Sequence, residues 1–151
     1  MNQKARDFAF ALDWMKEKGW NPWSIFTQAW HETGRFEKVI GQHNYWGIKY
    51  SKNWNDLRVQ VRTHEYENGE SVEKICEFAD WKTVKDALMF YDDLVQRLYP
   101  QAYDTRLDCL TFFRDLVNHK LKWATDPAYP EKLSRVYASL KFDQSVREFM
   151  P

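Results

Sequence analysis

The sequence predicts an α+β fold that is mostly helical, with a small β-hairpin lobe beside a helical lobe. Two patterns predict it. Apolar residues recur at helical spacing before residue 33 and after residue 83, whereas an alternating segment between them leads into Asn68–Gly69, the strongest short signal for a tight hairpin turn. No repeat, low-complexity tract or linker divides the 151 residues, so we expect one domain over residues 1–151.

Two helices are expected before the hairpin. Apolar residues at positions 8, 12 and 15 share one face of a helix over residues 6–18, and Gly19 ends that helix. Asn21 and Pro22 then have the character of an N-cap and a first helical residue, because the first turn needs no amide hydrogen from proline. The second helix therefore runs from there to Gly34.

The predicted hairpin has one regular strand and one less regular strand. Positions 59, 61, 63, 65 and 67 share a face of the strand that leads into the turn, and residues 71–78 form the returning strand. The apolar residues Val72 and Ile75 are three positions apart, so in a regular strand their side chains would lie on opposite faces. We therefore expect a bulge or a slipped register there.

Three helices are expected after the hairpin. The first begins at a capping box of Thr83 and Asp86 and ends before Pro100. The second has apolar residues at positions 107, 110, 113, 117 and 121, with positions 104 and 105 as candidate caps. The last begins where Asp126, as N-cap, precedes Pro127, and it has apolar residues at positions 133, 136, 137 and 140.

Composition excludes several function classes. Lys plus Arg and Asp plus Glu both number 22, so a nucleic-acid partner is not expected. No apolar run approaches the length of a membrane span, and we expect no membrane insertion. Aromatic residues make up 17% of the chain, with eight Trp and eight Tyr, and this excess suggests a groove in which flat rings contact a ligand.

The metal-ligating residue types form no recognisable ligand set. Cys76 and Cys109 match no zinc spacing, and we interpret them as buried free thiols, with a single disulfide as the alternative. The four histidines lie at positions 31, 43, 64 and 119 without a metal-binding pattern. We therefore expect neither a metal nor another cofactor.

Glu32 is the most conspicuous acid of the sequence. At 3.6 residues per turn, Ile25, Ala29 and Glu32 lie within about 60° of one another, which places the acid on the stripe expected to face the interior. It is either a glutamate at the core edge, paired with a cation or a backbone amide, or a general acid whose protonated form is favoured by partial burial. The residues around it leave both interpretations open.

Further candidates have equally plain structural explanations. Glu65 is either a solvated acid near a turn or the second carboxylate beside a scissile glycosidic bond. Tyr45 and Trp46 either pack under a loop or line a cleft beside Glu32, and Tyr91 has the spacing of a core residue. Two further aromatic residues, Trp123 and Tyr129, flank the turn at Asp126 and could reach into a groove.

Four blocks of the sequence resemble glycoside hydrolase family 73, the peptidoglycan-cleaving endo-β-N-acetylglucosaminidases that include flagellar-type domains, autolysins and phage lysins. The blocks follow one another in order between about residues 20 and 140: QAWHETG at 28–34, NYWGIK at 44–49, THEYENGE at 63–70 and WATDPAYPEKL at 123–133. The resemblance implies a lysozyme-like fold with a long glycan groove.

The resemblance also implies roles for individual residues. Glu32 would be the general acid and Glu65 the second carboxylate, either as a base that activates water or as a group that assists attack by the N-acetyl group of the substrate. The resemblance places Tyr45 and Trp46 where the family lines its sugar-binding subsites. Our further candidates for substrate binding are Asn44, Tyr91, Trp123 and Tyr129.

The sequence departs from the family pattern at three places. Thr33 follows the acid where serine is usual, and Tyr45–Trp46 replaces the usual Leu–Phe pair. Trp123 stands where the family commonly has a tyrosine, and an indole offers only an N–H donor. A hydroxyl contribution would then come from another group such as Tyr129, or would be absent.

The expected activity is cleavage of the β-1,4 bond between N-acetylglucosamine and N-acetylmuramic acid by a monomer. The alternatives are a muramidase, a lytic transglycosylase or a glycan-binding module without catalysis. The charged N-terminal stretch lacks the apolar core of a signal peptide, so we expect the protein to stay in the cytoplasm until a phage holin, a virion or a secretion apparatus brings it to the bacterial cell wall. A phage lysin is the preferred setting.

Overall fold

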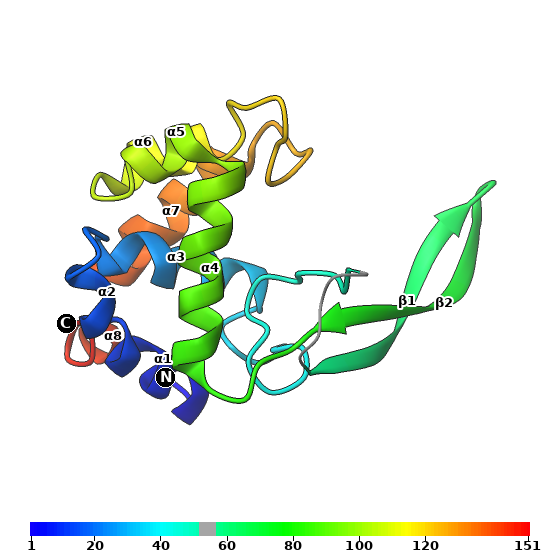
Figure 1. Cartoon of the computed structure of the whole chain (residues 1–151), viewed down its shortest axis with the longest axis horizontal. Coiled ribbons are helices and arrows are strands. Elements are labelled where there is room, and N and C mark those ends of the chain that lie inside the picture. Colours follow the sequence, from blue (N-terminus) through cyan, green and yellow to red (C-terminus); the bar gives the residue numbers. More distant parts are fainter. Residues whose placement is uncertain (52–56) are drawn as a thin grey trace.

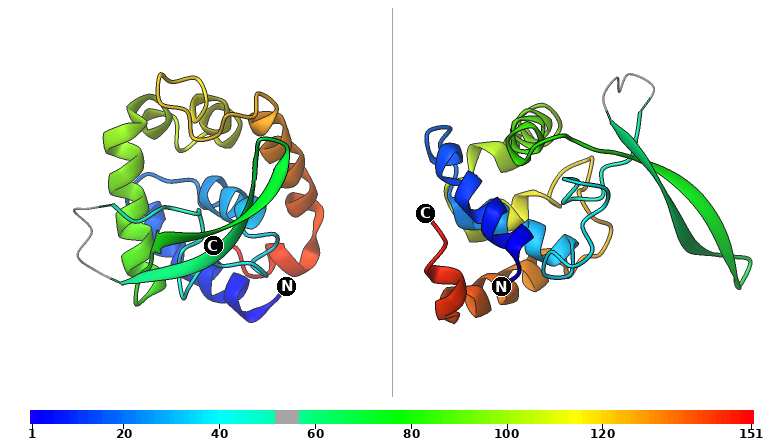
Figure 2. Two further views of the ribbon diagram at one scale, coloured as in Figure 1. Left: turned by 90° about the vertical axis from the view of Figure 1, so that its right-hand side faces the viewer. Right: turned by 90° about the horizontal axis from the view of Figure 1, so that it is seen from below.

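A computed structural model describes residues 1–51 and 57–151 of the chain. Helices form one lobe, and a two-stranded antiparallel hairpin projects from it (Figure 1). The right-hand view of Figure 2 shows the same projection from a perpendicular direction. The predicted mostly helical α+β architecture is thus confirmed.

The N-terminal helical segment begins and ends earlier than predicted, at Gln3 and Lys16, and is divided in two. Helix α1 (Gln3–Ala11) begins at Asn2, whose side chain accepts a hydrogen bond from the backbone amide of Ala5. After Leu12 the chain continues as the short helix α2 (Asp13–Lys16). The stop at Gly19 is confirmed, because this residue has a φ of 79°, which L side chains rarely adopt.

Helix α3 (Pro22–Glu32) follows the prediction closely. The Asn21 side chain accepts a hydrogen bond from the backbone amide of Trp23 at 3.1 Å, as expected of an N-cap, and Pro22 is the first helical residue. Residues 22 and 24–29 are buried. This helix therefore runs through the centre of the helical lobe.

The hairpin is regular over its whole length. Strand β1 (Arg58–Glu67) pairs with β2 (Glu70–Ala79) in an unbroken register, so the predicted bulge or slip is wrong. The side chains of Val72 and Ile75 can lie on opposite faces of the strand without a bulge, because the outer hairpin has no buried face. Ile75 is accordingly 64% exposed. The predicted turn is confirmed, with φ values of 52° at Asn68 and 80° at Gly69.

The base of the hairpin is joined to the segment that follows α3. Lys49 and Phe78 form an isolated antiparallel bridge, and the backbone amide of Ala79 donates to the carbonyl of Ile48 at 3.0 Å. The buried carboxylate of Asp80, directly after β2, accepts hydrogen bonds from the backbone amides of Gln42 and His43, both at 2.9 Å. These contacts hold residues 42–50 between the two lobes.

Helix α4 (Val84–Leu98) begins as predicted, because the Thr83 hydroxyl accepts a hydrogen bond from the Asp86 amide at 3.0 Å. The helix expected over residues 107–121 is wrong. The chain instead forms two short helices, α5 (Pro100–Asp104) and α6 (Cys109–Asp115), and Asp108 is the N-cap of α6. The apolar spacing at positions 107, 110 and 121 is not a core stripe, since these three leucines are at least half exposed.

The C-terminal helices are α7 (Tyr129–Phe142) and α8 (Gln144–Arg147). The predicted start of α7 at Asp126 is wrong by two residues, because Ala128 is the N-cap and Pro130 lies in the first turn. Asp126 instead accepts a hydrogen bond from the Ala128 amide at 2.9 Å in the preceding turn. Asp126 also forms an ion pair with Lys132. This contact, followed by the hydrogen bond from the Ala128 amide, lowers the pKa of Asp126.

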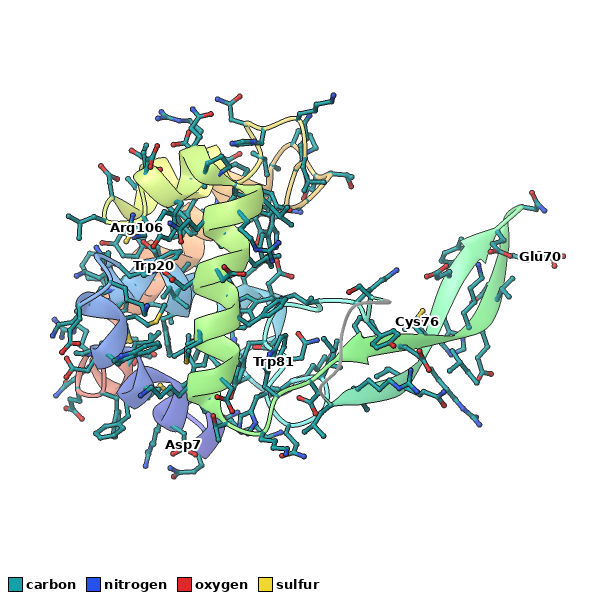
Figure 3. The ribbon with its side chains drawn as sticks, in the orientation of Figure 1. Asp7, Trp20, Glu70, Cys76, Trp81 and Arg106 are labelled. Carbon is teal, nitrogen blue, oxygen red and sulfur yellow. The ribbon has the colours of Figure 1, made fainter. Side chains whose placement is uncertain are left out.

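Aromatic side chains form much of the core of the helical lobe. Trp20, Tyr91, Phe8, Phe26 and Phe112 are among the largest fully buried residues. Figure 3 shows Trp20 within the helical lobe, whereas Glu70 marks the far end of the hairpin. The indole of Trp20 donates to the buried carboxylate of Asp92 at 2.8 Å, which joins the start of α3 to α4.

The cysteines are free, as predicted, but only one of them is buried. Cys109 lies in the core, whereas Cys76 is half-buried on β2. Across the described ranges 1–51 and 57–151, no helix has both the length and the apolar character needed to cross a bilayer.

Candidate active site

Glu32 is the last residue of α3, and its side chain is exposed. The prediction that it faces the interior is therefore wrong. Ile25 and Ala29 on the same stripe are fully buried, but the stripe leaves the core where the helix ends. The acid consequently lies at the surface, directly beyond the buried part of α3.

The turn after Glu32 is tightly constrained. The hydroxyl of Thr33 donates to the carbonyl of Ala29 at 2.6 Å and accepts from the amide of Phe36 at 2.8 Å. Arg35 and Phe36 have φ values of 64° and 63°, in the left-handed region that is costly for residues with a Cβ atom. Such a turn gives the end of α3 a fixed backbone geometry.

Two side chains donate hydrogen bonds to the same oxygen of Glu32. The Tyr129 hydroxyl lies 2.6 Å from Oε1, and the Trp123 indole Nε1 lies 3.3 Å from it. Tyr129 is the first residue of α7, and Trp123 belongs to the loop before that helix. The structure thus brings together three of the residues singled out in the sequence, and it fixes the side chain of Glu32 through Oε1.

A buried polar chain continues behind Tyr129. The Gln28 amide donates through Nε2 to the Tyr129 hydroxyl at 3.1 Å, and Gln28 Oε1 accepts from the hydroxyl of Tyr91. Gln28 and Tyr91 are fully buried. Burial, followed by the nearby charge of Glu32, raises the pKa values of Tyr91 and Tyr129 well above 10.0, so both phenols remain protonated donors at neutral pH.

Gln28 was not singled out in the sequence as a site residue. It lies one helical turn before Glu32, within a run of buried residues, 24–29, on α3. A polar residue at this position of a buried stripe is the signal that could have identified it, because a buried amide needs hydrogen-bond partners.

Asn44 orders the loop that carries the two aromatic candidates. Its amide donates to the carbonyls of Ile48 and Ala79 at 2.9 and 2.7 Å, and its Oδ1 accepts from the amides of Trp46 and Ile48 at 3.3 and 3.2 Å. The side chain is 1% exposed. In this structure its polar groups are therefore used by the protein's own backbone.

The aromatic candidates Tyr45, Trp46 and Tyr91 are all buried. The rings of Trp46 and Tyr91 stack with centroids 4.4 Å apart and an interplanar angle of 16°, and Tyr45 packs on Phe8 at 4.5 Å. Packing is thus their main contribution in this structure. Trp46 also lines a surface hollow.

That hollow has a volume of about 180 Å³ and lies between α4, the 46–48 segment and Trp123. A second hollow of about 420 Å³ shares Ile48, Leu94 and Leu98 with it and continues to residues at the base of β2. Together they form a depression that begins at Trp123, a direct neighbour of Glu32, and runs toward the hairpin.

The hairpin candidate Glu65 lies apart from this cluster. It is exposed in the outer half of β1, where Lys74 Nζ of β2 lies 3.4 Å from its carboxylate and also contacts Glu67. The two carboxylates raise the pKa of Lys74, with Glu67 making the larger contribution. No polar contact joins Glu65 to Glu32 within the part of the chain that the structure describes.

The described residues offer no metal centre. Within residues 1–51 and 57–151, no three His, Cys, Asp or Glu side chains gather in a way that could hold an ion. The arrangement at Glu32 is that of a single carboxylate with oriented donors, which suits proton transfer to a bound substrate.

A comparison with protein families decides the class of the protein. Residues 9–142 match the glucosaminidase model described as mannosyl-glycoprotein endo-beta-N-acetylglucosaminidase. The chain belongs to this glucosaminidase family. The family recognised from the four sequence blocks is thereby confirmed, and the chain is classed as a glycoside hydrolase.

Curated relatives of the chain are named peptidoglycan hydrolase FlgJ. The protein from Vibrio parahaemolyticus is 28% identical over 131 residues, which cover 80% of this chain and 41% of the relative. The protein from Escherichia coli K12 is 28% identical over 123 residues, which cover 78% of this chain and 39% of the relative. The chain thus spans about two fifths of the length of these relatives.

Solved structures share the fold of the chain over nearly its whole length. A mutant peptidoglycan hydrolase from Sphingomonas sp. A1 is 28% identical with a TM-score of 0.75, and 98% of this chain and 97% of that chain are covered. The truncated glycoside hydrolase domain of FlgJ from Salmonella typhimurium is 27% identical with a TM-score of 0.73, with coverage of 93% and 99%. The expected lysozyme-like fold is confirmed.

Proposed function

We propose that the protein hydrolyses the β-1,4 bond between N-acetylglucosamine and N-acetylmuramic acid in peptidoglycan, with Glu32 as the general acid. The observation that carries this proposal is the pair of donors on one oxygen of an exposed carboxylate, from Tyr129 and Trp123. Family membership and the names of the relatives support the substrate class.

The proposed acid step follows from the hydrogen bonds of Glu32. Because Oε1 accepts from Tyr129 and Trp123, the proton of the neutral acid resides on Oε2. Oε2 donates this proton to the glycosidic oxygen as the bond to the anomeric carbon of N-acetylglucosamine breaks and positive charge develops on the sugar. The two donors then stabilise the carboxylate that remains.

Trp123 supplies one of these donors in place of the usual family tyrosine. Its indole N–H points at Glu32, whereas the hydroxyl contact comes from Tyr129. This arrangement supports catalysis over the alternative of a binding module, because the change at position 123 leaves the carboxylate with two donors.

Glu65 is our proposed second carboxylate. In the mechanism it either removes a proton from the attacking water or orients the N-acetyl group of the substrate, and both tasks favour an ionised carboxylate. Lys74 Nζ lies 3.4 Å from the Glu65 carboxylate. Glu67, which contacts the same lysine two positions away on the same strand face, is the matched control residue.

The experiment that tests the acid compares Glu32→Gln with Glu37→Gln, a change of another exposed glutamate in the segment after α3. We expect Glu32→Gln to abolish wall clearing while glycan binding and folding persist, and Glu37→Gln to behave as the parent. Clearing by Glu32→Gln at the parent rate would remove Glu32 from the mechanism.

Product analysis tests the bond that is cut. A new reducing N-acetylglucosamine end supports the proposal, a new reducing N-acetylmuramic acid end would identify a muramidase, and 1,6-anhydromuramic ends would identify a lytic transglycosylase. For the second carboxylate, Glu65→Gln should lower the rate by about two to three orders of magnitude, and Glu67→Gln should not. Equal effects of the two changes would reduce Glu65 to a partner of Lys74.

The biological setting stays a prediction. We expect a phage lysin that reaches the wall on host lysis, whereas the relatives in the comparisons carry flagellar names. Lysis of a bacterial culture after co-expression with a phage holin, and not without it, is the outcome that this setting requires.

A further inference from the structure

We propose that Gln28 is a positioning residue, which aims the Tyr129 hydroxyl at Glu32 and thereby selects the glutamate oxygen that carries the catalytic proton. The inference rests on the proposed function, in which Glu32 is the general acid. It assigns a role to a fully buried residue that touches neither the substrate nor the exposed carboxylate.

The first step is the orientation of the Gln28 amide. The Tyr91 hydroxyl donates to Gln28 Oε1. Tyr91 is itself fixed by packing, because its ring centroid lies 4.4 Å from that of Trp46, on which it stacks, and 5.4 Å from that of Trp20. With the amide oxygen directed at Tyr91, the amide nitrogen faces Tyr129, so the buried tyrosine of α4 sets which end of Gln28 meets α7.

The second step is the direction of the Tyr129 proton. The Tyr129 oxygen accepts from Gln28 Nε2 at 3.1 Å, and its single proton is therefore directed to Glu32 Oε1 at 2.6 Å. If residue 28 offered an acceptor instead of a donor, the hydroxyl could satisfy that acceptor and leave Glu32. The nitrogen of Gln28 thus prevents a competing orientation of the phenol.

The third step is the consequence for the acid. Glu32 Oε1 is occupied by Tyr129 and Trp123, so Oε2 is the oxygen that carries the proton toward the scissile bond. Gln28 and Glu32 lie one turn apart on α3, while Tyr91 belongs to α4 and Tyr129 to α7. The hydrogen bonds from Tyr91 through Gln28 and Tyr129 to Glu32 therefore make the position of the Glu32 proton depend on how these three helices pack.

The test replaces Gln28 by residues of similar size with different hydrogen-bonding capacity. Gln28→Glu keeps an acceptor for Tyr91 but removes the donor to Tyr129, and Gln28→Met removes both. The control is Thr27→Val on the same helix, since Thr27 is also fully buried and its hydroxyl has no hydrogen-bond partner among the described residues. Each variant is assayed for kcat and KM, with circular dichroism as a check of folding.

Two substrates separate positioning from general damage. One is a soluble peptidoglycan oligosaccharide, whose leaving sugar needs a proton. The other is a disaccharide with N-acetylglucosamine bonded to dinitrophenolate, which leaves without one. For Gln28→Glu and Gln28→Met we expect kcat on the oligosaccharide to fall about 10- to 100-fold, as for a lost hydrogen bond to a charged group. KM, and the rate on the dinitrophenyl substrate, should stay within about twofold of the parent.

The outcomes are distinguishable from failure of the proposed function. Glu32→Gln is assayed in parallel and should lose the oligosaccharide activity while it keeps the dinitrophenyl activity. If Glu32→Gln cleaves both substrates at the parent rate, the proposed acid is wrong. If Glu32→Gln behaves as expected but Gln28→Glu retains the parent kcat, or loses both activities equally, the positioning role of Gln28 is overturned.

Discussion

Tyr129 and Glu32 are hydrogen-bonded at 2.6 Å although 97 positions separate them in the sequence. The contact joins the first residue of α7 to the last residue of α3, two helices that pack against each other. Because the hydroxyl is buried and the carboxylate is exposed, this pair forms a boundary between the protein interior and the surface on which a glycan would lie.

Replacement of Tyr129 by Phe should lower kcat about 10- to 100-fold, the effect of one lost hydrogen bond to a charged group. The ring remains, so binding of the substrate should change little. The control is Tyr137→Phe on the same helix, whose side chain faces Cys109 and not Glu32. Parent-like kinetics of Tyr129→Phe on a peptidoglycan oligosaccharide would contradict the role of this hydroxyl.

Replacement of Trp123 by Phe should have a smaller effect. The longer indole contact of 3.3 Å is lost, while a ring that can pack near Tyr91 and Tyr99 remains. Because this hydrogen bond to Glu32 is longer than that of Tyr129, at 3.3 Å against 2.6 Å, we expect it to contribute about 0.5–1.5 kcal/mol, which corresponds to a decrease of about two- to tenfold in kcat. Trp14→Phe, on α2, is the matched change and should leave steady-state rates unaltered. A larger loss than that of Tyr129→Phe would reverse the proposed ranking of the two donors.

Replacement of Asn44 by Asp should destabilise the fold by about 2–4 kcal/mol, because the buried carbonyls of Ile48 and Ala79 lose their donors and a charge enters a buried site. Urea unfolding followed by tryptophan fluorescence measures the change. Asn118→Asp alters an exposed asparagine and should shift the midpoint little. If the two variants unfold at the same urea concentration, the side chain of Asn44 is not what orders the loop.

Alkaline pH should weaken the fold. Folding raises the pKa values of Tyr91 and Tyr129 well above 10.0, so the unfolded chain releases these protons first, and stability is lost as pH rises above about 10. Each group can contribute a slope of up to about 1.4 kcal/mol per pH unit. Thermal unfolding between pH 9 and 11 should show a shallower decline for Tyr129→Phe than for Tyr66→Phe, whose ring is 84% exposed. Identical slopes would contradict this assignment.

Local patterns predicted those elements whose signals act within a few residues. Asn21–Pro22 starts α3, Thr83 starts α4 and Asn68–Gly69 forms the hairpin turn, because caps and tight turns depend on neighbouring backbone groups. The apolar spacing after residue 104 predicted a single long helix that does not form, because burial of a helix face depends on distant parts of the chain. Leucines at positions 107, 110 and 121 fit a helical stripe, yet each is at least half exposed, so a period alone does not show that a face is buried.

The candidate site shows the same division. The sequence blocks identified Glu32, Trp123 and Tyr129, and the structure places these three in contact. The expectation of a buried Glu32 failed because periodicity cannot show where a core ends along a helix. Gln28 was overlooked because its partners, Tyr91 and Tyr129, come from two other helices.

By itself the sequence determined the family, the helical character, the hairpin turn and the acid at the end of α3, since each depends on residue types at short, fixed spacings. Only the tertiary structure decided that both donors meet Oε1 of Glu32, which leaves Oε2 for the proton in the proposed mechanism. The direction of a hydrogen bond depends on how α3, α4 and α7 pack, and residues in contact across that packing lie from 63 to 101 positions apart.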